Sequence, residues 1–178
     1  MIKPLVSIIF PVYFNEPNLP YLAKEIDNFT KEVSFFSFEF IFVDDGSPDQ
    51  SYIEMQKLLE IIKAKVTLVQ LTRNFGQGAA VRAGFEIASG DVIGTISSDQ
   101  QDPLIVFKGM LKSWENGCKV VLAARNNRSD GFLLDKLSII FFKFIKKNII
   151  PGFPEMGCDV FLIDKEVKEN LIKKDERG

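Results

Sequence analysis

Short apolar stretches alternate strictly with longer helical stretches through most of this 178-residue chain, and this alternation restricts its fold more than any other feature. Each apolar stretch is rich in β-branched and aromatic residues and is bounded by turn residues, which is typical of a buried strand. We expect strands at 6–12, 38–43, 66–71, 91–96 and 119–124, and helices at 18–33, 51–63, 78–88 and 104–116.

A chain that alternates strands with helices forms a mostly parallel sheet, because parallel neighbours need a long crossover, which is usually a helix. We therefore expect an α/β fold, with a Rossmann-like, doubly wound sheet and helices on both faces. The length fits a single domain. Three polar loops, at 44–45, 73–74 and 99–102, would lie at the carboxyl edge of the sheet, where such folds bind ligands.

The composition excludes several kinds of site and partner. The chain has no histidine, which excludes Ser-His-Asp and Cys-His catalysis and every histidine metal site. Its two cysteines are far apart, which favours reduced thiols in a cytoplasmic protein. A net charge of -2 gives no reason to expect nucleic acid as a partner. Because the chain has no signal-like segment and no apolar run of about 18 residues, we do not expect an integral membrane protein.

The stretch from Ile93 to Pro103 changes from an apolar strand to carboxylate and amide side chains, and then to a proline. The strand would hold Asp99, Gln101 and Asp102 at the ligand-binding edge. Oxygen ligands of this kind suit a hard divalent cation that also contacts a phosphorylated substrate. The pattern fits equally well a polar turn in which Asp102 caps a helix that begins at Pro103. At this point both interpretations stay open.

The alternation ends after the fifth expected strand. Arg125 and Arg128 follow that strand and would contact phosphate oxygens, although a solvated turn has the same composition. An apolar helix with interspersed lysines is expected at 133–150, and it fits an anionic membrane surface as well as the core of a larger domain. A last strand at 157–163 would carry Asp159 near its start, and a short charged helix would follow it.

The chain lacks the glycine-rich phosphate loop of kinases and dehydrogenases. Gly76-Gln-Gly78 begins such a motif, but Val81 occupies the place of the third glycine, and no Gly-Lys-Ser/Thr follows a strand. A bound pyrophosphate would therefore have to be neutralised by a metal ion and by arginines. That arrangement is typical of nucleotide-sugar transferases.

Four motifs resemble those of family 2 glycosyltransferases in order and spacing: Phe10-Pro-Val-Tyr-Phe-Asn-Glu16, Val43-Asp-Asp-Gly-Ser47, Arg73-Asn-Phe-Gly76 and Ser98-Asp-Gln-Gln-Asp-Pro103. The resemblance covers residues 5–171. The Gln-Asp-Pro ending favours the dolichyl-phosphate mannose synthase and undecaprenyl-phosphate sugar transferase branch. It implies a GT-A fold and inversion at the anomeric carbon. The single domain, 1–178, would comprise a nucleotide-sugar-binding half at 1–124 and the start of an acceptor half at 125–178.

The resemblance also implies roles for residues on the nucleoside side of the site. Pro11, Tyr13 and Glu16 would line the nucleoside pocket. Val43 and Asp45 would hold the base or the ribose.

On the phosphate side, Ser98, Asp99 and Gln101 match the metal-diphosphate motif of the family, with Asp99 and Gln101 as ligands of Mg²⁺ or Mn²⁺. Arg125 matches an arginine that reaches the donor phosphates, and Asp159 matches an acidic residue near the acceptor. Asp99 and Asp159 are accordingly the expected catalytic residues.

The chemistry of the transfer agrees with these roles. Charge develops on the departing nucleoside diphosphate, and a divalent ion with Arg125 would stabilise it, while Arg73 and Arg128 would bind substrate at the same edge. A phosphate acceptor, with a second pKa of about 6, is already largely ionised at neutral pH. It needs little help from a general base, so Asp159 would orient the sugar or the acceptor.

Three departures from the family pattern bear on activity. Ser97 stands where the metal motif usually begins with Asp. Phe161 stands two residues after Asp159, where the family usually has an arginine. Family members also continue beyond the matched segment with basic motifs and, in many cases, transmembrane helices. Two expectations therefore remain: a metal-dependent enzyme, or an inactive nucleotide-sugar-binding module or subunit that requires a membrane partner.

For the enzyme we expect a UDP- or GDP-sugar donor and an undecaprenyl or dolichyl phosphate acceptor, in cell-envelope or glycan biosynthesis. The acceptor implies a peripheral location at the cytoplasmic face of the membrane. A homo-oligomer and a membrane-subunit partner both stay open.

Overall fold

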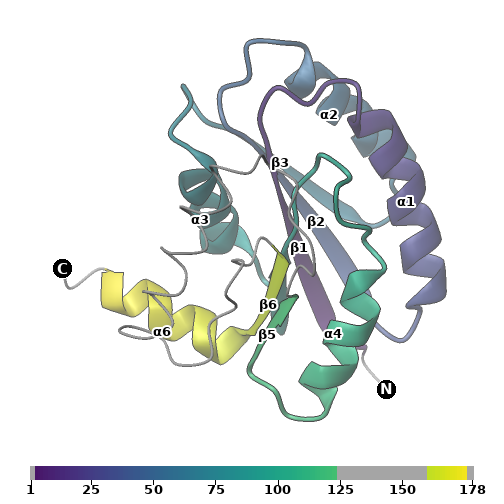
Figure 1. Cartoon of the computed structure of the whole chain (residues 1–178), viewed down its shortest axis with the longest axis vertical. Helices are drawn as coiled ribbons and strands as arrows, with labels where there is room; N and C mark the ends of the chain where they lie inside the picture. Colours follow the sequence, from purple (N-terminus) through teal and green to yellow (C-terminus); the bar gives the residue numbers. More distant parts are fainter. Residues whose placement is uncertain (1–2, 124–159, 176–178) are drawn as a thin grey trace, which may run out of the picture.

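A computed structural model describes residues 3–123 and 160–175 of the chain. Its elements follow the order β1 (Leu5–Val12), α1 (Leu19–Glu32), β2 (Ser37–Asp44), α2 (Ser51–Ile61), β3 (Lys65–Gln70), α3 (Gln77–Ile87), β4 (Val92–Thr95), α4 (Val106–Glu115), β5 (Val120–Ala123), β6 (Val160–Asp164) and α6 (Lys165–Asp175) (Figure 1). The strict alternation expected from the sequence is confirmed as far as β5.

The strands form one sheet in the order β3-β2-β1-β4-β6-β5. Strands β3, β2, β1 and β4 run parallel to one another, which confirms a mostly parallel sheet. Strand β6 lies between β4 and β5 and runs antiparallel to both. The rule that strand, helix and strand make a parallel pair does not apply to β6, because the alternation has ended before it.

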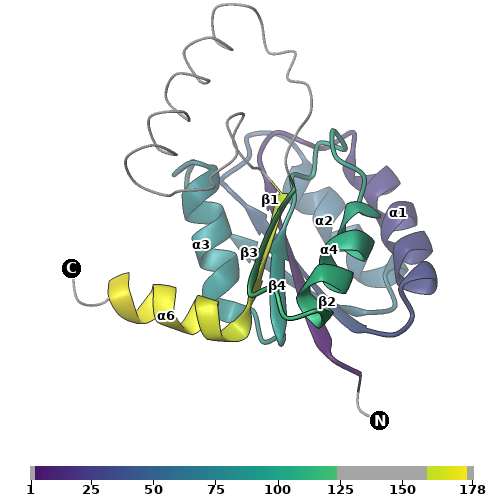
Figure 2. The ribbon, with the colours of Figure 1, turned by 60° about the horizontal axis from the view of Figure 1, so that its bottom comes forward.

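Helices cover both faces of the sheet, as expected. Helices α1, α2 and α4 lie on one face, and α3 and α6 lie on the other (Figure 2). On the first face, Phe10 of β1 stacks on Phe42 of β2 at a centroid distance of 4.9 Å, and both rings are fully buried. Full burial of such a ring contributes about 2–3 kcal/mol to folding, so this cluster is a large part of the core.

The opposite face is covered closely by α3, the helix expected to be rich in small residues. Ile9 of β1 and Ile93 of β4 are buried there with Ala80 of α3. A Cβ atom on Gly84 would lie 2.5 Å from Cγ2 of Ile9, so the helix approaches the sheet only because this residue lacks a side chain.

One boundary differs from expectation and excludes Asp102 as the cap of this helix. Helix α4 begins at Val106 with Ile105 at its N-cap, so it is wrong that it begins at Pro103 with Asp102 as its cap. Hydrogen bonds from Val106 N to Pro103 O and from Phe107 N to Leu104 O form a tight turn ahead of the helix. The N–H of Leu104 donates to Glu25 Oε1 of α1 at 2.6 Å, which satisfies it from a different element.

A buried carboxylate ties strands together at the amino edge of the sheet. Glu39 of β2 is 1% exposed and accepts hydrogen bonds from Ser7 Oγ at 2.6 Å, Lys65 Nζ at 2.7 Å and Ser89 N at 2.7 Å. Burial alone would raise the pKa of Glu39, but these hydrogen bonds outweigh it and lower the pKa to about 2. The ionised group therefore holds β1, β2, β3 and the turn before β4 at this edge.

Some expected elements lie outside the described residues, namely the helix at 133–150 and the start of the last strand at 157–159. The remainder of that strand is β6, and the charged helix after it is α6. Within 3–123 and 160–175, no helix is both long and apolar enough to cross a bilayer.

Candidate functional site

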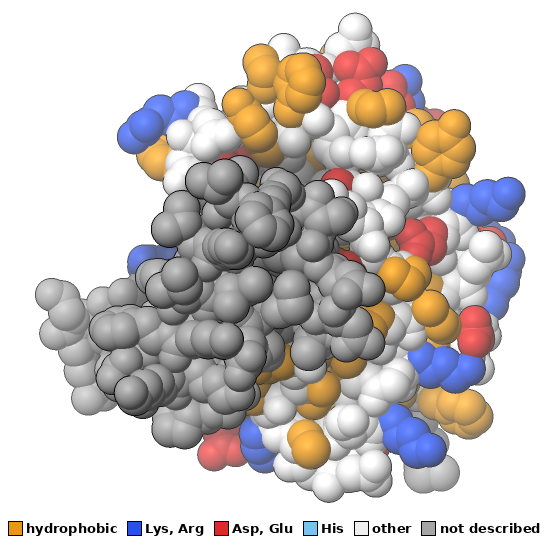
Figure 3. Space-filling view, in the orientation of Figure 1, with side chains coloured by type: hydrophobic (Ala, Val, Ile, Leu, Met, Phe, Trp, Pro, Cys, Tyr) orange, Lys and Arg blue, Asp and Glu red, His pale blue; other side chains and the backbone are white. Residues whose placement is uncertain are grey.

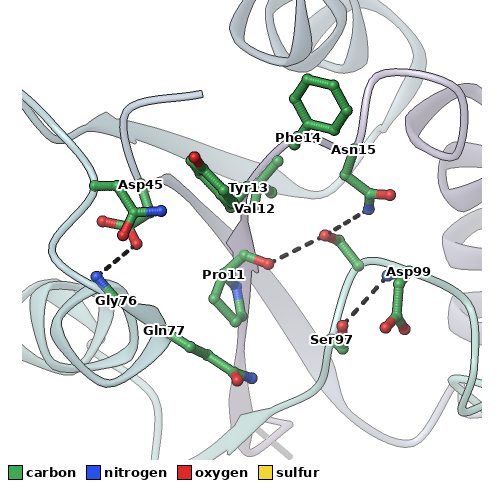
Figure 4. A pocket seen from close by; sticks show the side chains of 12 residues that line it. Pro11, Val12, Tyr13, Phe14, Asn15, Asp45, Gly76, Gln77, Ser97 and Asp99 are labelled. Atoms are coloured by element: carbon green, nitrogen blue, oxygen red, sulfur yellow. Dashed lines mark hydrogen bonds between the residues drawn. The ribbon is translucent and has the colours of Figure 1, made fainter. Parts of the chain in front are cut away.

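A pocket of about 330 Å³ opens at the carboxyl edge of the sheet, next to the N-terminus of α3. Its lining residues come from the loops that follow β1, β2, β3 and β4: Pro11, Val12, Tyr13, Phe14, Asn15, Asp45, Asn74, Gly76, Gln77, Ser97, Ser98 and Asp99 (Figure 4). The edge predicted to bind ligands is therefore where the cavity lies. Apolar side chains are exposed near the top of the molecule in Figure 3. Tyr13, Phe14 and Phe75 are at least half-exposed.

The loop after β1 turns sharply at Phe14, whose φ of 52° lies in the left-handed region. Such a backbone is rare for a bulky residue and is held here by a hydrogen bond from Phe14 N to Ser47 Oγ at 3.0 Å. The turn leaves Tyr13 half-exposed on the side of Asp45 and directs Asn15 toward Ser97–Asp99, as Figure 4 shows.

The loop after β2 fixes the loop after β3. Asp45 is 2% exposed, and its two carboxylate oxygens accept hydrogen bonds from the N–H groups of Phe75 and Gly76, each at 2.8 Å. Gly46 has a φ of 66°, and a Cβ atom there would lie 2.5 Å from the carbonyl carbon of Arg73. Asp45 and Gly46 thus position the backbone that leads into α3 and forms one wall of the pocket.

The loop after β4 carries the motif first interpreted as a metal site. Ser98 is 3% exposed; its Oγ donates to Pro11 O at 3.1 Å and accepts from Asn15 Nδ2 at 2.7 Å. The N–H of Asp99 donates to Ser97 Oγ at 3.4 Å, and Asp99 Oδ1 accepts from the N–H of Gln101 at 3.1 Å. Asp99 is exposed at the pocket, its N–H is held by Ser97, and its carboxylate is oriented by the N–H of Gln101.

The donor atoms at this edge fit a hard divalent cation that shares its coordination with a ligand. The described residues contain no group of three or more carboxylate, cysteine or histidine side chains that could enclose a metal by themselves. Mg²⁺ is usually bound through one or two carboxylates, with water and substrate phosphates completing its shell. An exposed Asp99 beside an open pocket meets that requirement.

A family model described as "Glycosyl transferase family 2" matches residues 7–171. The chain belongs to this family. The expected membership is thereby confirmed, and the match includes all the loops that form the pocket.

Two curated relatives illustrate the similarity of this family 2 chain. It is 34% identical over 174 residues to a bactoprenol glucosyl transferase of Shigella phage SfV, covering 97% of this chain and 56% of the relative. It is 40% identical over 173 residues to an undecaprenyl-phosphate 4-deoxy-4-formamido-L-arabinose transferase of Pseudomonas fluorescens. That match covers 97% of this chain and 51% of the relative. The chain thus spans about half the length of the curated relatives it matches.

Solved structures confirm the GT-A fold expected of a family 2 member. A mannosyltransferase from Pyrobaculum calidifontis, in complex with GDP-Man and Mn²⁺, superposes with a TM-score of 0.67 at 17% sequence identity. The superposition covers 96% of this chain and 47% of that one. At this level of identity the likeness concerns the fold.

The structure brings several predicted family 2 site residues together around the pocket: Pro11, Tyr13, Asp45, Ser98 and Asp99. Their assigned roles stay predictions. Gln101 is exposed in the same turn as Asp99 but does not line the pocket.

Other predicted residues lie away from the pocket wall. Glu16 Oε2 accepts a hydrogen bond from Gln50 N at 3.1 Å and so ties two loops together. The side chain of Val43 is fully buried on the α3 face of the sheet. Arg73 is exposed, with its guanidinium carbon 4.2 Å from the centroid of the Phe75 ring. Arg125, Arg128 and Asp159 lie outside the described residues.

Six lining residues have no role assigned from the sequence: Val12, Phe14, Asn15, Asn74, Gly76 and Gln77. The sequence could have indicated Asn74 and Gln77 as site residues. Both lie between a parallel strand and the helix after it, at the ligand-binding edge. Phe14 and Asn15 were part of a recognised motif. Their placement depends on the left-handed turn at Phe14, which the residue type does not predict.

Proposed function

We propose that this chain forms the nucleotide-sugar-binding part of an inverting glycosyltransferase that moves a sugar from a UDP- or GDP-sugar to a polyprenyl phosphate. The observation that carries the proposal is that Tyr13 and Asp99 line one pocket of a family 2 domain. An aromatic ring suits a nucleobase, and an exposed carboxylate suits the cation that accompanies a diphosphate. The curated relatives, a bactoprenol glucosyl transferase and an undecaprenyl-phosphate sugar transferase, support the acceptor class.

In this mechanism the protein orients the donor and stabilises the leaving group. Tyr13 would stack on the base, with Asp45 beside it, and Asp99 and Gln101 would hold Mg²⁺ or Mn²⁺. When bound, the cation would supply positive charge next to the departing diphosphate. Arg125 would add charge at the same phosphates.

The acceptor would be the nucleophile. One of its phosphate oxygens would attack the anomeric carbon while the bond from that carbon to the diphosphate breaks, which inverts the configuration. Because a phosphate monoester is largely ionised at neutral pH, no strong general base is needed, and Asp159 would orient the sugar or the acceptor. A lipid acceptor implies work at the cytoplasmic membrane surface, to which the lysine-bearing stretch 133–150 is suited.

Calorimetric titration of the chain with UDP, GDP and their sugars, with and without Mn²⁺, tests donor binding. A transfer assay with a short polyprenyl phosphate follows. We expect binding of one nucleotide class that Mn²⁺ strengthens, and transfer of the matching sugar. If no nucleotide binds, the proposal is wrong.

A second candidate is a nucleotide-sugar-binding module without turnover. Phe161 occupies the position at which the family usually has an arginine, and its ring stacks on Phe85 of α3 at a centroid distance of 5.9 Å. The position is thus used for packing. Donor binding without transfer to the polyprenyl phosphate would favour this candidate.

A further inference from the structure

Asn15 connects two sides of the pocket that belong to different loops. It is 7% exposed, and no role was assigned to it above. Its backbone N–H donates to Ser51 Oγ at the start of α2 at 2.8 Å, and its side-chain Nδ2 donates to Ser98 Oγ at 2.7 Å. Its Oδ1 accepts a hydrogen bond from Asn18 Nδ2. A single buried amide thus links the loop after β1, the start of α2 and the loop after β4.

The link ends next to the proposed metal ligand. Ser98 immediately precedes Asp99, and its hydroxyl is held between Asn15 and the carbonyl oxygen of Pro11. A second contact joins the same loops, from Gln100 Nε2 to Asn18 O at 3.4 Å. Because Gln100 has a φ of 62°, this turn has an uncommon backbone that depends on such contacts to persist.

The other end of the link is the proposed nucleoside wall. Tyr13 lies two residues before Asn15, on the far side of the turn at Phe14. Fixing Asn15 by three hydrogen bonds therefore fixes the backbone that presents Tyr13. A shift of the loop after β4 would be transmitted to Asn15 and the loop after β1 through the hydrogen bond between Asn15 and Ser98, and the reverse holds as well.

We propose that Asn15 is a positioning residue that couples cation binding at Asp99 to nucleotide binding beside Tyr13. This inference rests on the proposed function. Coupling is a free energy shared by two sites, so it is measured as the factor by which the cation strengthens nucleotide binding. A purely structural role would instead weaken binding equally with and without the cation.

Asn15→Asp tests the link with little change in shape. The carboxylate can still accept from Asn18, but it cannot donate to Ser98, and the Ser98 hydroxyl can turn toward it only by releasing the carbonyl oxygen of Pro11. Ser98→Ala removes the same hydrogen bond by deleting the hydroxyl group that accepts it. If Asn15→Asp does not fold, Ser98→Ala tests the inference alone. Asn28→Asp places the same charge on the exposed surface of α1 and is the matched control.

Each variant is titrated with UDP and with GDP, at zero and at saturating Mn²⁺. We expect Asn15→Asp and Ser98→Ala to reduce the factor by which Mn²⁺ strengthens nucleotide binding roughly five- to tenfold, the effect of one buried hydrogen bond. Asn28→Asp should match the wild type. An unchanged strengthening factor in both variants, or an equal loss with and without Mn²⁺, overturns the inference.

Amide hydrogen exchange of the nucleotide-free and metal-free protein provides a second readout. We expect faster exchange at residues 98–101 in Asn15→Asp and Ser98→Ala, with β4 itself unchanged. Unchanged exchange at 98–101 overturns the inference even if nucleotide binds normally. If the wild type binds no nucleotide, the proposed function is wrong and the coupling falls with it, which distinguishes the two failures.

Discussion

Asp99 combines a fixed backbone with an exposed carboxylate, and this combination suits a residue that must present charge to a ligand. Its N–H donates to Ser97 Oγ, and its Oδ1 accepts from the N–H of Gln101. Asp99→Asn keeps the acceptor for Gln101 but removes the charge. Asp99→Ala removes both.

We predict that both Asp99 variants lose the strengthening of nucleotide binding by Mn²⁺, because the loss of the charge is common to them. Their midpoints of urea unfolding should stay close to that of the wild type, since the side chain is exposed. Titration calorimetry with and without Mn²⁺ measures the first effect. Unchanged affinity in Mn²⁺ would exclude Asp99 as a ligand.

Ser97 marks the position at which the family pattern has a carboxylate. Its hydroxyl accepts from the N–H of Asp99, a bond that an aspartate oxygen can also accept. We predict that Ser97→Asp tightens Mn²⁺ binding roughly tenfold, because affinity rises with the number of charged oxygen ligands. Direct Mn²⁺ titration monitored by electron paramagnetic resonance measures the change. Ser97→Asn is the uncharged control, and equal affinities for the two variants would contradict the prediction.

Some residues of the site could be predicted because their positions are defined by strand ends. Asp45 follows β2 directly, Ser98 and Asp99 lie in the loop after β4, and the carboxyl edge brings them together. Asn15 could not be assigned in this way. Its burial follows from the turn at Phe14 and from a partner far along the chain, Ser98, so only the folded structure reveals it.

At the scale of the elements, the loops after β2 and β3 pack so closely at Gly46 that no side chain fits between them. Gly46 has a positive φ, and any Cβ there would overlap the backbone of Arg73 and Asn74. Two separate effects therefore oppose a side chain at this position: backbone strain and a collision that no rotamer change can relieve.

We predict that Gly46→Ala lowers the free energy of unfolding by about 1–3 kcal/mol and displaces the Asn74–Gln77 side of the pocket, which weakens nucleotide binding. Urea denaturation and nucleotide titration measure the two effects. Gly109→Ala in α4 is the control: a Cβ atom there meets nothing within 4 Å, and alanine favours the helix by about 1 kcal/mol. Equal stability of Gly46→Ala and the wild type would contradict the prediction.

The direction of β6 is the element-level feature that the sequence pattern could not supply. Val160 and Leu162 are buried and alternate with Phe161, and a period of two is the same for a strand running either way. The direction of a strand depends on the connection that precedes it, and the segment between β5 and β6 lies outside the described residues. The boundary of α4 was missed for a similar reason, since Glu25 of α1 takes the N–H expected for a local cap.

At the scale of the whole molecule, the sheet has a charged anchor at its amino edge and a pocket at its carboxyl edge. The pKa of Glu39 is about 2 in the folded chain, against 4.5 for an ordinary glutamate. A lowered pKa means that the folded state favours the ionised group. The resulting stabilisation is complete above about pH 4.5 and is lost as the pH falls toward 2.

We predict that the free energy of unfolding falls by about 3 kcal/mol between pH 4.5 and pH 2 through this group. Glu39→Gln should be less stable than the wild type by about 1–3 kcal/mol at pH 7, and the two should converge at low pH. Urea denaturation across this range measures both effects. Glu60→Gln, on the exposed surface of α2, should follow the wild-type curve; a parallel curve for Glu39→Gln would contradict the prediction.

The pairing of β5 with β6 has a consequence for how such a domain can diversify. Ala123 lies directly opposite Val160, so the chain leaves the sheet and re-enters it at neighbouring points. Because the two ends of the intervening segment are already paired, doubling its length would cost only about 0.6 kcal/mol of loop-closure entropy. The length between β5 and β6 can therefore change at little cost to the sheet.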